Sequence, residues 1–202
     1  MATPGEVESI VGSVGLLGGT FDPPHIGHLI AALEVRFAAD LDRMVLIPAG
    51  DPWQKTAERA ITPAHHRLAM VRAAIQGLEG LSVDPVEVER DGPSFMVDTL
   101  LELSAPDLRL ALVLGSDAAR HLNTWNRYDE LPELADLIIV SRPGTMPLAP
   151  DWWPARVVEI PLIGVSSSDL RRRFTQGEPV DAQTPPAVVA YAREHRLYAD
   201  RP

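Results

Sequence analysis

The chain has 202 residues and a formal net charge of −10, so it lacks the basic excess that favours general nucleic-acid binding or attachment to an acidic membrane surface. It contains no cysteine, which excludes disulfides and thiolate sites. We expect a single domain over residues 1–202, with no nucleic-acid or membrane partner and a cytoplasmic location. Residues 1–12 are expected to form a flexible N-terminal extension, and the composition leaves a homo-oligomer open.

Strands and helices are predicted to alternate along the first half of the chain. The apolar run at 14–17 predicts a buried strand, and the pattern at 27–39 predicts a helix. A second apolar run at 44–48 follows after about 30 residues, which is the spacing of a β-α-β unit. The other elements expected in this half are a polar loop (49–63), a helix that Pro63 starts (65–75), a strand (81–89) and a helix with Ser94 as a candidate N-cap (94–104).

The same alternation continues in the second half. The elements expected there are strands at 108–114, 137–140 and 157–160, helices from 118, over 167–174 and over 185–193, and a short helical connection at 125–134. This order predicts the α/β class, with a Rossmann-like open, mostly parallel sheet that has helices on both faces. Ligands of such sheets bind beyond the carboxyl ends of the strands. We therefore expect a site where Gly18-Gly19, residues 51–55, residues 115–117 and Arg142 meet.

The first strand ends in Gly18-Gly19, and a proline-rich turn then leads to His25 and His28 at the start of the predicted helix. Glycines let a phosphate approach the backbone closely, and the free amides of a helix N-terminus point toward its charge. The two histidines share one helix face and add hydrogen-bond donors, which favours a phosphate site. Zinc is the weaker interpretation because the pair lacks further nearby ligands, so no metal-binding residue is assigned. Asp22 is expected to stabilise the turn rather than to react.

Residues 18–28 read Gly-Gly-Thr-Phe-Asp-Pro-Pro-His-Ile-Gly-His and closely resemble the start of nucleotidyltransferases with the H-x-G-H signature. Further motifs occur in the order seen in the bacterial nicotinate-nucleotide adenylyltransferases. They are Ile-Pro-Ala-Gly-Asp-Pro-Trp-Gln-Lys (47–55), Gly-Pro-Ser-Phe-Met-Val-Asp-Thr-Leu (92–100), Gly-Ser-Asp (115–117), Trp125, Ser-Arg-Pro-Gly (141–144) and Ser-Ser-Ser-Asp-Leu-Arg (166–171). The resemblance runs from about Val14 to Tyr198 and is specific to this branch as an ordered set.

The resemblance implies the nucleotidyltransferase type of Rossmann-like fold and an enzyme that transfers the adenylyl group of ATP to nicotinate mononucleotide, giving deamido-NAD and pyrophosphate in NAD biosynthesis. It implies that Mg²⁺ binds with ATP and that 165–202 form a C-terminal helical part that completes the ATP site. The residues implied as catalytic are His25, His28, Lys55 and Arg171. Those implied for ATP are Gly18, Gly19, Thr20, Phe21, His25, His28, Gly115, Asp117, Arg142, Ser167, Ser168 and Arg171. Those implied for the mononucleotide are Lys55, Met96, Asp117 and Trp125, with Trp125 as the stacking platform for the pyridine ring.

Two positions depart from the family pattern and bear on the acceptor. Met96 stands where the family usually has threonine, and Asn126 stands where an aromatic residue often follows the tryptophan. A backbone amide can still bind a nicotinate carboxylate, so nicotinate mononucleotide remains the first choice. The alternatives are another phosphate acceptor, namely nicotinamide mononucleotide or phosphopantetheine, and a non-catalytic nucleotide-binding protein on the same fold.

Several of these residues also have a purely structural interpretation. Lys55, the only lysine, could be a solvated loop charge, and Trp125 could fill the core. Asp117 could cap a helix, and Ser167 or Ser168 is expected to cap the helix that follows. Two further arginines, Arg172 and Arg173, are expected to form a surface cluster that pairs with the acidic excess.

Overall fold

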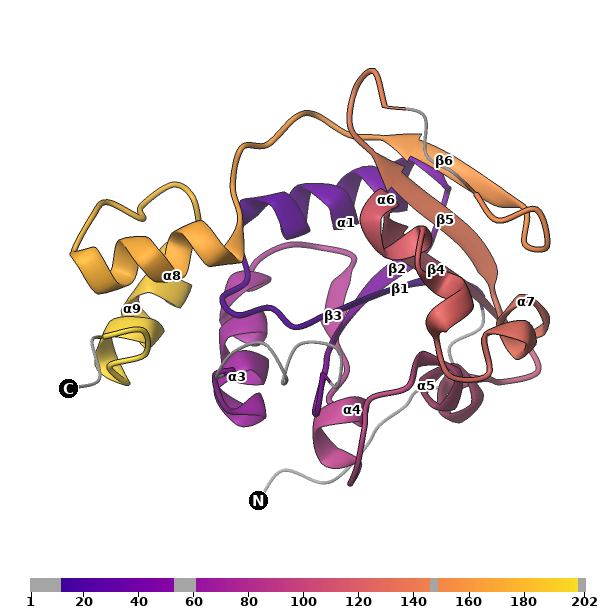
Figure 1. The fold of residues 1–202 in the computed structure, drawn as a ribbon, viewed down its shortest axis with the longest axis horizontal. Coiled ribbons are helices and arrows are strands. Elements are labelled where there is room, and N and C mark those ends of the chain that lie inside the picture. Colours follow the sequence, from indigo (N-terminus) through magenta and orange to yellow (C-terminus); the bar gives the residue numbers. More distant parts are fainter. Residues whose placement is uncertain (1–11, 53–60, 146–148, 200–202) are drawn as a thin grey trace.

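A computed structural model describes residues 12–52, 61–145 and 149–199. Its centre is a six-stranded sheet in the order β3-β2-β1-β4-β5-β6, and every neighbouring pair is parallel. The strands are β1 (Gly12–Gly19), β2 (Arg43–Pro48), β3 (Leu81–Val83), β4 (Leu108–Gly115), β5 (Asp136–Ser141) and β6 (Ala155–Glu159). This strand order reverses direction between β1 and β4, as in dinucleotide-binding sheets, and confirms the predicted α/β class (Figure 1).

Helices cover both faces of the sheet because successive strand residues point to opposite sides. Leu16 and Leu112 pack in one buried cluster, whereas their neighbours Leu17 and Val113 pack in the other. The helices of the first face are α4 (Val86–Glu89), α5 (Met96–Leu103), α6 (Ser116–Ala119), the 3-10 turns η1 (Leu122–Thr124) and η2 (Tyr128–Glu130), and α7 (Leu131–Leu134). The helices of the second face are α1 (Ile26–Ala38) and α3 (Ala64–Ala74). Both faces are therefore buried, as the apolar run at 14–17 predicts.

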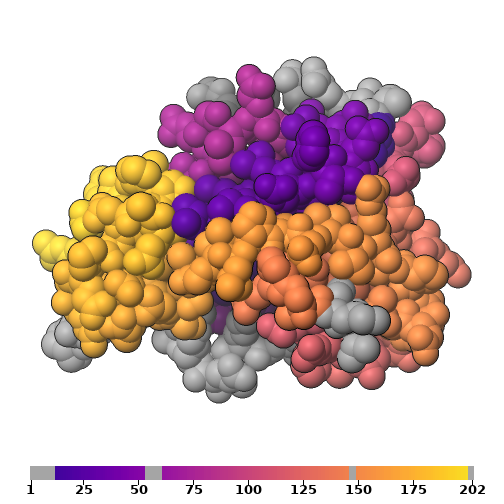
Figure 2. All heavy atoms as spheres, turned by 90° about the horizontal axis from the view of Figure 1, so that it is seen from above, coloured from indigo at the N-terminus to yellow at the C-terminus, as the bar shows by residue number. Residues whose placement is uncertain are grey.

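Two C-terminal helices, α8 (Ser167–Gln176) and α9 (Pro186–Glu194), form a lobe at one end of the molecule (Figure 1). Helix α9 packs on α3 through an apolar cluster that includes Met70, Ala74, Val188 and Ala192. Figure 2 shows this yellow lobe lying against the indigo N-terminal segment. The chain therefore brings its C-terminal helices back to the region where β1 ends. No helix among the described residues is long and apolar enough to cross a membrane.

The structure corrects the strand predicted at 81–89. β3 ends at Val83, and a short helix, α4, takes up the second part. The Oδ1 atom of Asp84 accepts the amide hydrogen of Val86 at 2.9 Å, which turns the chain out of the sheet and begins that helix. The apolar spacing of the valines fits either element, so this local turn at Asp84 was the missing signal.

Three capping predictions are also corrected. Phe95, not Ser94, is the N-cap of α5, because the Ser94 hydroxyl accepts amides of another loop instead. Ser166, rather than Ser167 or Ser168, caps α8 by accepting the amide hydrogen of Asp169 at 3.1 Å. Asp117 does not cap α6, whose N-cap is Gly115. Gly12 already belongs to β1, and residues 1–11 of the predicted flexible extension lie outside the described residues.

Candidate active site

Two cavities open where the central strands end. The first, of about 430 Å³, lies between the end of β1 and the start of α5. Its described lining residues are Gly18, Gly19, Thr20, Ala49, Pro52, Glu87, Ser94, Phe95, Met96, Leu114, Asp117, Ala118, Trp125 and Asn126. Most of this surface is apolar or aromatic, with the carboxyl groups of Glu87 and Asp117 among it. Such a cavity suits a planar ring with few polar groups.

The second cavity, of about 340 Å³, lies beside the start of α1. Its described lining residues are Leu17, His25, Gly27, His28, Ala31, Gly115, Ser116, Asp117, Arg120, Val140, Ser141, Arg142, Thr145, Ile160, Pro161, Ile163 and Val165. It combines two imidazoles and two guanidiniums with apolar walls from the ends of β5 and of the segment after β6. Asp117 lines both cavities, so the two spaces meet at the start of α6.

The two histidines of the first turn of α1 form a stacked pair. Their ring centroids are 3.7 Å apart, with the rings 24° from parallel. The Nδ1 atom of His28 accepts the backbone amide hydrogen of His25 at 3.1 Å, so a neutral His28 carries its ring hydrogen on Nε2. A Cβ atom at Gly27 would lie 3.0 Å from Nδ1 of His25, a tight contact that only a shift of the ring would relieve. His28 is therefore a hydrogen-bond donor even without a charge.

His25 is the more buried of the pair, with 9% of its surface exposed. Burial lowers its pKa from 6.5 to about 4, because a charged ring would lose its hydration. Its Nδ1 atom has no hydrogen-bond partner among the described residues. A buried ring nitrogen without a partner costs free energy until a ligand or water satisfies it. His25 is among the residues that line the second cavity, and this buried nitrogen lies within its ring.

The turn between β1 and α1 is held from the C-terminal lobe. Phe21 adopts a left-handed backbone with φ of 49°, and the neighbouring Asp22 is 1% exposed. Four side chains from the lobe donate hydrogen bonds to the turn. Arg171 donates to the backbone carbonyl of Asp22 at 2.6 Å, and Tyr198 donates to the Asp22 carboxylate at 2.8 Å. Ser167 donates to the carbonyl of Pro23 at 2.8 Å, and Thr184 donates to the carbonyl of Pro24 at 2.7 Å. Residues more than 140 positions apart in the sequence thus fix the segment that carries both histidines.

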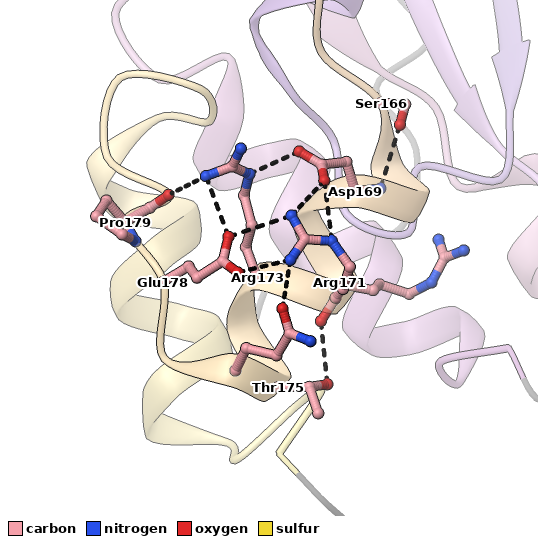
Figure 3. Close-up of polar contacts among 9 residues, drawn as sticks. Ser166, Asp169, Arg171, Arg173, Thr175, Glu178 and Pro179 are labelled. Carbon is pink, nitrogen blue, oxygen red and sulfur yellow. Dashed lines mark hydrogen bonds and ion pairs between the residues drawn. The ribbon is translucent and has the colours of Figure 1, made fainter.

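The three consecutive arginines of α8 take different directions. Arg173 donates to Asp169 at 2.6 Å, and Arg172 donates to Asp169 at 2.7 Å and to Glu178 at 2.6 Å (Figure 3). Hydrogen bonds from Arg173 and Arg172 lower the pKa of the Asp169 carboxyl, and the bond from Arg172 lowers that of Glu178. Arg171 points away from this network, toward the turn. This confirms the prediction that Arg172 and Arg173 pair with acidic residues at the surface.

The structure gathers most of the site residues predicted from the sequence around the two cavities. Gly18, Gly19, Thr20, Met96 and Trp125 line the first cavity, His25, His28, Gly115 and Arg142 line the second, and Asp117 lines both. Phe21, Ser167, Ser168 and Arg171 are not among the lining residues; Phe21 is buried with its ring edge-on to that of His28, and the other three lie beside the turn. Lys55 lies outside the described residues.

Sequence reasoning missed a buried group in the first cavity. Glu87 is 4% exposed and accepts a hydrogen bond from the hydroxyl of Thr99 at 2.8 Å. Burial raises the pKa of its carboxyl, and the hydrogen bonds from Thr99 and Ser94 oppose that effect. Because Glu87 stands between Val86 and Val88, the alternating pattern predicts a strand with the Glu87 side chain facing solvent. Its hydrogen-bond partners Ser94 and Thr99 lie 7 and 12 positions later in the chain, at the start of another helix, so periodicity does not reveal the contact.

Among the described residues, no three or more histidine, cysteine, aspartate or glutamate side chains lie together as a metal-binding group. Apart from the carboxylate of Asp117, the ionisable groups among the described lining residues of the second cavity are imidazoles and guanidiniums, which suit an anion. A divalent ion brought in by a nucleotide would take its ligands from phosphate oxygens and water.

Comparison with known proteins agrees with this geometry. A family model described as cytidylyltransferase-like matches residues 16–173. A protein of Roseiflexus sp. (strain RS-1), named "Probable nicotinate-nucleotide adenylyltransferase", is 43% identical over 194 residues, covering 92% of this chain and 97% of that protein. A protein of the same name from Leifsonia xyli subsp. xyli is 40% identical over 190 residues, covering 92% of this chain and 93% of that protein.

A solved structure shares the fold over nearly the whole chain. The nicotinic acid mononucleotide adenylyltransferase of Plasmodium falciparum, complexed with NaAD, superposes with a TM-score of 0.74 at 19% identity, covering 93% of this chain and 97% of that one. The same enzyme complexed with APC gives a TM-score of 0.71. Together with the family match and the close relatives, these findings show that the chain belongs to the cytidylyltransferase-like family of nucleotidyltransferases and, within it, to the nicotinate-nucleotide adenylyltransferases.

Proposed function

We propose that the second cavity takes ATP, that the first takes nicotinate mononucleotide, and that the enzyme joins them into deamido-NAD with release of pyrophosphate. One observation carries this proposal: the histidine pair and the aromatic pocket lie in adjoining cavities that share Asp117. A dinucleotide product needs two nucleotide sites in contact at their phosphate ends. The close relatives named for this activity support the choice of acceptor.

The proposed reaction requires no covalent bond between the protein and a substrate. An oxygen of the mononucleotide phosphate attacks the α-phosphorus of ATP, the new P–O bond forms, and the bond from that phosphorus to the bridging oxygen of pyrophosphate breaks. The nucleophile is already an anion, so no strong base is required. Catalysis then consists of aligning the two substrates and stabilising charge on the phosphoryl oxygens.

The H-x-G-H turn is proposed to supply that stabilisation. His28 offers its Nε2–H to a phosphoryl oxygen, because its Nδ1 is committed to the amide of His25. His25 offers a second ring nitrogen, and a phosphate beside it would favour the protonated form that burial disfavours. Gly18, Gly19 and Thr20 line the acceptor cavity just before this turn, where the glycines let the reacting phosphates lie close to the backbone.

Basic groups around the turn complete the proposed phosphate site. Arg142 lines the ATP cavity directly. Arg171, together with Ser167 and Ser168 at the start of α8, lies against the turn from the C-terminal lobe, which is how 165–202 would complete the site. The sequence resemblance adds Lys55 as a further phosphate contact. ATP would arrive as its Mg²⁺ complex, with the ion held mainly by phosphate oxygens and water, and no catalytic step is assigned to a protein metal site.

On the acceptor side, Trp125 and the start of α5 are proposed to hold the pyridine ring. Trp125 lines the cavity and offers a flat face for stacking. Met96 is the first residue of α5, and the amides of a first helical turn have no partner within the helix. These amides favour a negative group, so they suit the carboxylate of nicotinate more than the neutral amide of nicotinamide. The N-terminus of α5 is thus proposed to take the place of the threonine hydroxyl that the family usually has at the position of Met96.

Pyrophosphate release tests the proposal. The full chain is assayed with Mg²⁺ and ATP against nicotinate mononucleotide, nicotinamide mononucleotide and phosphopantetheine in parallel. We expect the highest kcat/KM with nicotinate mononucleotide and a loss of roughly 10²–10³ in kcat for His28→Ala, which removes one well-placed donor. His65→Ala, on the exposed surface of α3, is the matched control and should keep full activity. Absence of turnover with both pyridine nucleotides would refute the assignment.

A further inference from the structure

Arg67 is among the largest fully buried side chains of the described chain, with 1% of its surface exposed. It lies on the inward face of α3, in line with Met70, Val71 and Ala74. Arginine stays charged under all ordinary conditions, and burying a charge costs several kcal/mol unless its donors are satisfied. An apolar residue would fill this helix position at no such cost. The buried charge therefore calls for an explanation beyond packing.

The Arg67 guanidinium donates to three carbonyl oxygens from three separate segments. Nε reaches the carbonyl of Thr62 at 2.8 Å, one terminal nitrogen reaches that of Thr20 at 2.9 Å, and the other reaches that of Gly50 at 3.0 Å. Thr20 follows β1, Gly50 follows β2, and Thr62 precedes α3. The planar fork of arginine can span three acceptors in this way, whereas the single ammonium of lysine cannot hold the same three directions.

Two of these carbonyls belong to segments that form the acceptor cavity. Thr20 lines the cavity, and Gly50 follows the lining residue Ala49 directly. The Thr20 carbonyl is part of the peptide that precedes the left-handed Phe21, a backbone state that costs of order 1–3 kcal/mol and needs outside support. Arg67 supplies one such support at the point where the chain turns toward His25.

Gly50 is fixed from its other side as well. Its amide hydrogen is accepted by the Ser94 hydroxyl at 2.9 Å, and that of Asp51 by the same oxygen at 3.2 Å. A Cβ atom at Gly50 would lie 1.9 Å from the carbonyl oxygen of Glu87, so no other residue fits there. The peptide groups on either side of Gly50 are therefore held between Arg67 and Ser94, and the end of β2 has little freedom to shift.

We propose that Arg67 is a positioning residue that holds the ends of β1 and β2 in fixed relation, so that the acceptor cavity stays aligned with the histidine turn. Arg67 is not among the described residues that line either cavity, and it acts through the carbonyls of Thr20 and Gly50. This inference rests on the proposed adenylyl transfer. In-line attack is sensitive to small displacements, and a shift of about 1 Å can reduce the rate about 10²-fold while binding is little changed.

The test compares Arg67→Lys and Arg67→Met with the matched control Arg36→Lys. Arg36 donates from α1 to the carbonyl of Asp42 at 3.1 Å, just before β2 begins and so at the opposite end of the strands from Gly50. All variants are assayed well below the lowest Tm of the set. We expect Arg67→Lys to fold, to lose about 10- to 100-fold in kcat, and to keep both KM values within about threefold, with a larger loss for Arg67→Met. Arg36→Lys should keep the kcat of the unmodified enzyme.

Hydrogen–deuterium exchange supplies a readout independent of turnover. Amides of 18–22 and 49–52 should exchange faster in Arg67→Lys than in Arg36→Lys, while those of β4 and β5 stay unchanged. Unchanged kcat and unchanged exchange in a folded Arg67→Lys would overturn the proposal. A uniform rise in exchange over the whole chain would also overturn it, since it would mean a general loss of stability. If the unmodified enzyme shows no turnover, the proposed function fails, and the exchange pattern alone decides the role of Arg67.

Discussion

The hydroxyl of Tyr198 donates a hydrogen bond to a carboxylate oxygen of Asp22 at 2.8 Å, across 176 positions of sequence. Burial and the neighbouring Asp22 charge raise the pKa of Tyr198 above its ordinary value, so the phenol stays protonated and remains a donor. This bond ties the end of the C-terminal lobe to the turn that carries the histidines. The turn is therefore as stable as the docking of the lobe permits.

Tyr198→Phe should cost about 1–2 kcal/mol in the free energy of unfolding, because a buried carboxylate loses a donor. Urea unfolding followed by circular dichroism measures the loss. Tyr191→Phe is the control: it removes a hydroxyl that pairs with the half-buried His66 at 2.9 Å, and should cost about 0.5 kcal/mol. Equal losses for the two variants would contradict a special role for the Asp22 contact.

Trp125→Ala should raise the KM for nicotinate mononucleotide about 10- to 100-fold, because stacking on an aromatic face contributes about 1–3 kcal/mol per base. The KM for ATP should change less than about threefold. Trp125 lines the acceptor cavity and is not among the described residues that line the ATP cavity. Steady-state kinetics with each substrate varied in turn measure both constants. Trp152→Ala, which truncates a tryptophan that is 40% exposed, should leave both KM values unchanged. A parallel rise in both KM values for Trp125→Ala would speak against stacking.

Arg171→Ala and Arg172→Ala should separate catalysis from surface stability. Arg171 reaches the turn, so its removal should lower kcat/KM for ATP at least about 10²-fold. Arg172 forms exposed ion pairs, so its removal should cost under about 1 kcal/mol in unfolding and leave kcat/KM intact. The same kinetic and unfolding measurements serve both variants. Loss of activity in Arg172→Ala alone would reverse this division of roles.

The pKa of His25 predicts how stability depends on pH. The folded state keeps this ring neutral down to about pH 4, whereas the unfolded chain takes up the proton near pH 6.5. The unfolded state therefore binds more protons between these values, and the free energy of unfolding falls as pH falls from 6.5 to 4, by at most about 3 kcal/mol from this group. Unfolding of the natural chain and of His25→Asn across this range measures the difference. In His25→Asn, the free energy of unfolding should change less with pH over this range.

ATP binding should reverse that preference for the neutral ring. A phosphate beside His25 favours the imidazolium, so binding should take up protons near pH 6. Titration calorimetry in buffers of different ionisation enthalpy measures this uptake, and His25→Asn should reduce it. No proton uptake in either protein would mean that His25 stays neutral beside the nucleotide.

The sequence was a good guide to the sheet because its signals are local. The apolar runs at 14–17, 44–48 and 108–114 each became a buried parallel strand, with ends within three residues of those predicted. The glycine turn and the H-x-G-H tetrapeptide predicted a helix start with two histidines on one face, and the structure stacks their rings. The spacing of apolar residues and the positions of glycine and proline were enough to predict these strands and this helix.

The segment at 81–89 shows where such signals fail. Val83, Val86 and Val88 give an apolar pattern that fits either element over so few residues. The carboxylate of Asp84 and the burial of Glu87 decide for a helix, and both depend on contacts made only in the folded protein. A single sequence read by periodicity does not contain that information.

Most residues predicted to bind phosphate line the two cavities or lie beside the histidine turn, whereas the buried residues that support this region were not predicted. Arg67, Glu87 and Tyr198 act through partners far away in sequence, at Thr20, Thr99 and Asp22. One signal was present: Arg67 interrupts the apolar stripe of α3 that Met70, Val71 and Ala74 continue. An arginine on a core-facing stripe predicts a buried cation, and such a cation must find acceptors somewhere in the fold.

Asp117 lines both cavities, and this shared wall has a thermodynamic consequence. A ligand that shifts or screens its carboxylate in one cavity changes the free energy of binding in the other. Such coupling is reciprocal, so ATP must alter the affinity for the mononucleotide by the same factor by which the mononucleotide alters the affinity for ATP. With the two nucleotides bound in these cavities as proposed, we expect Asp117 to couple their binding free energies.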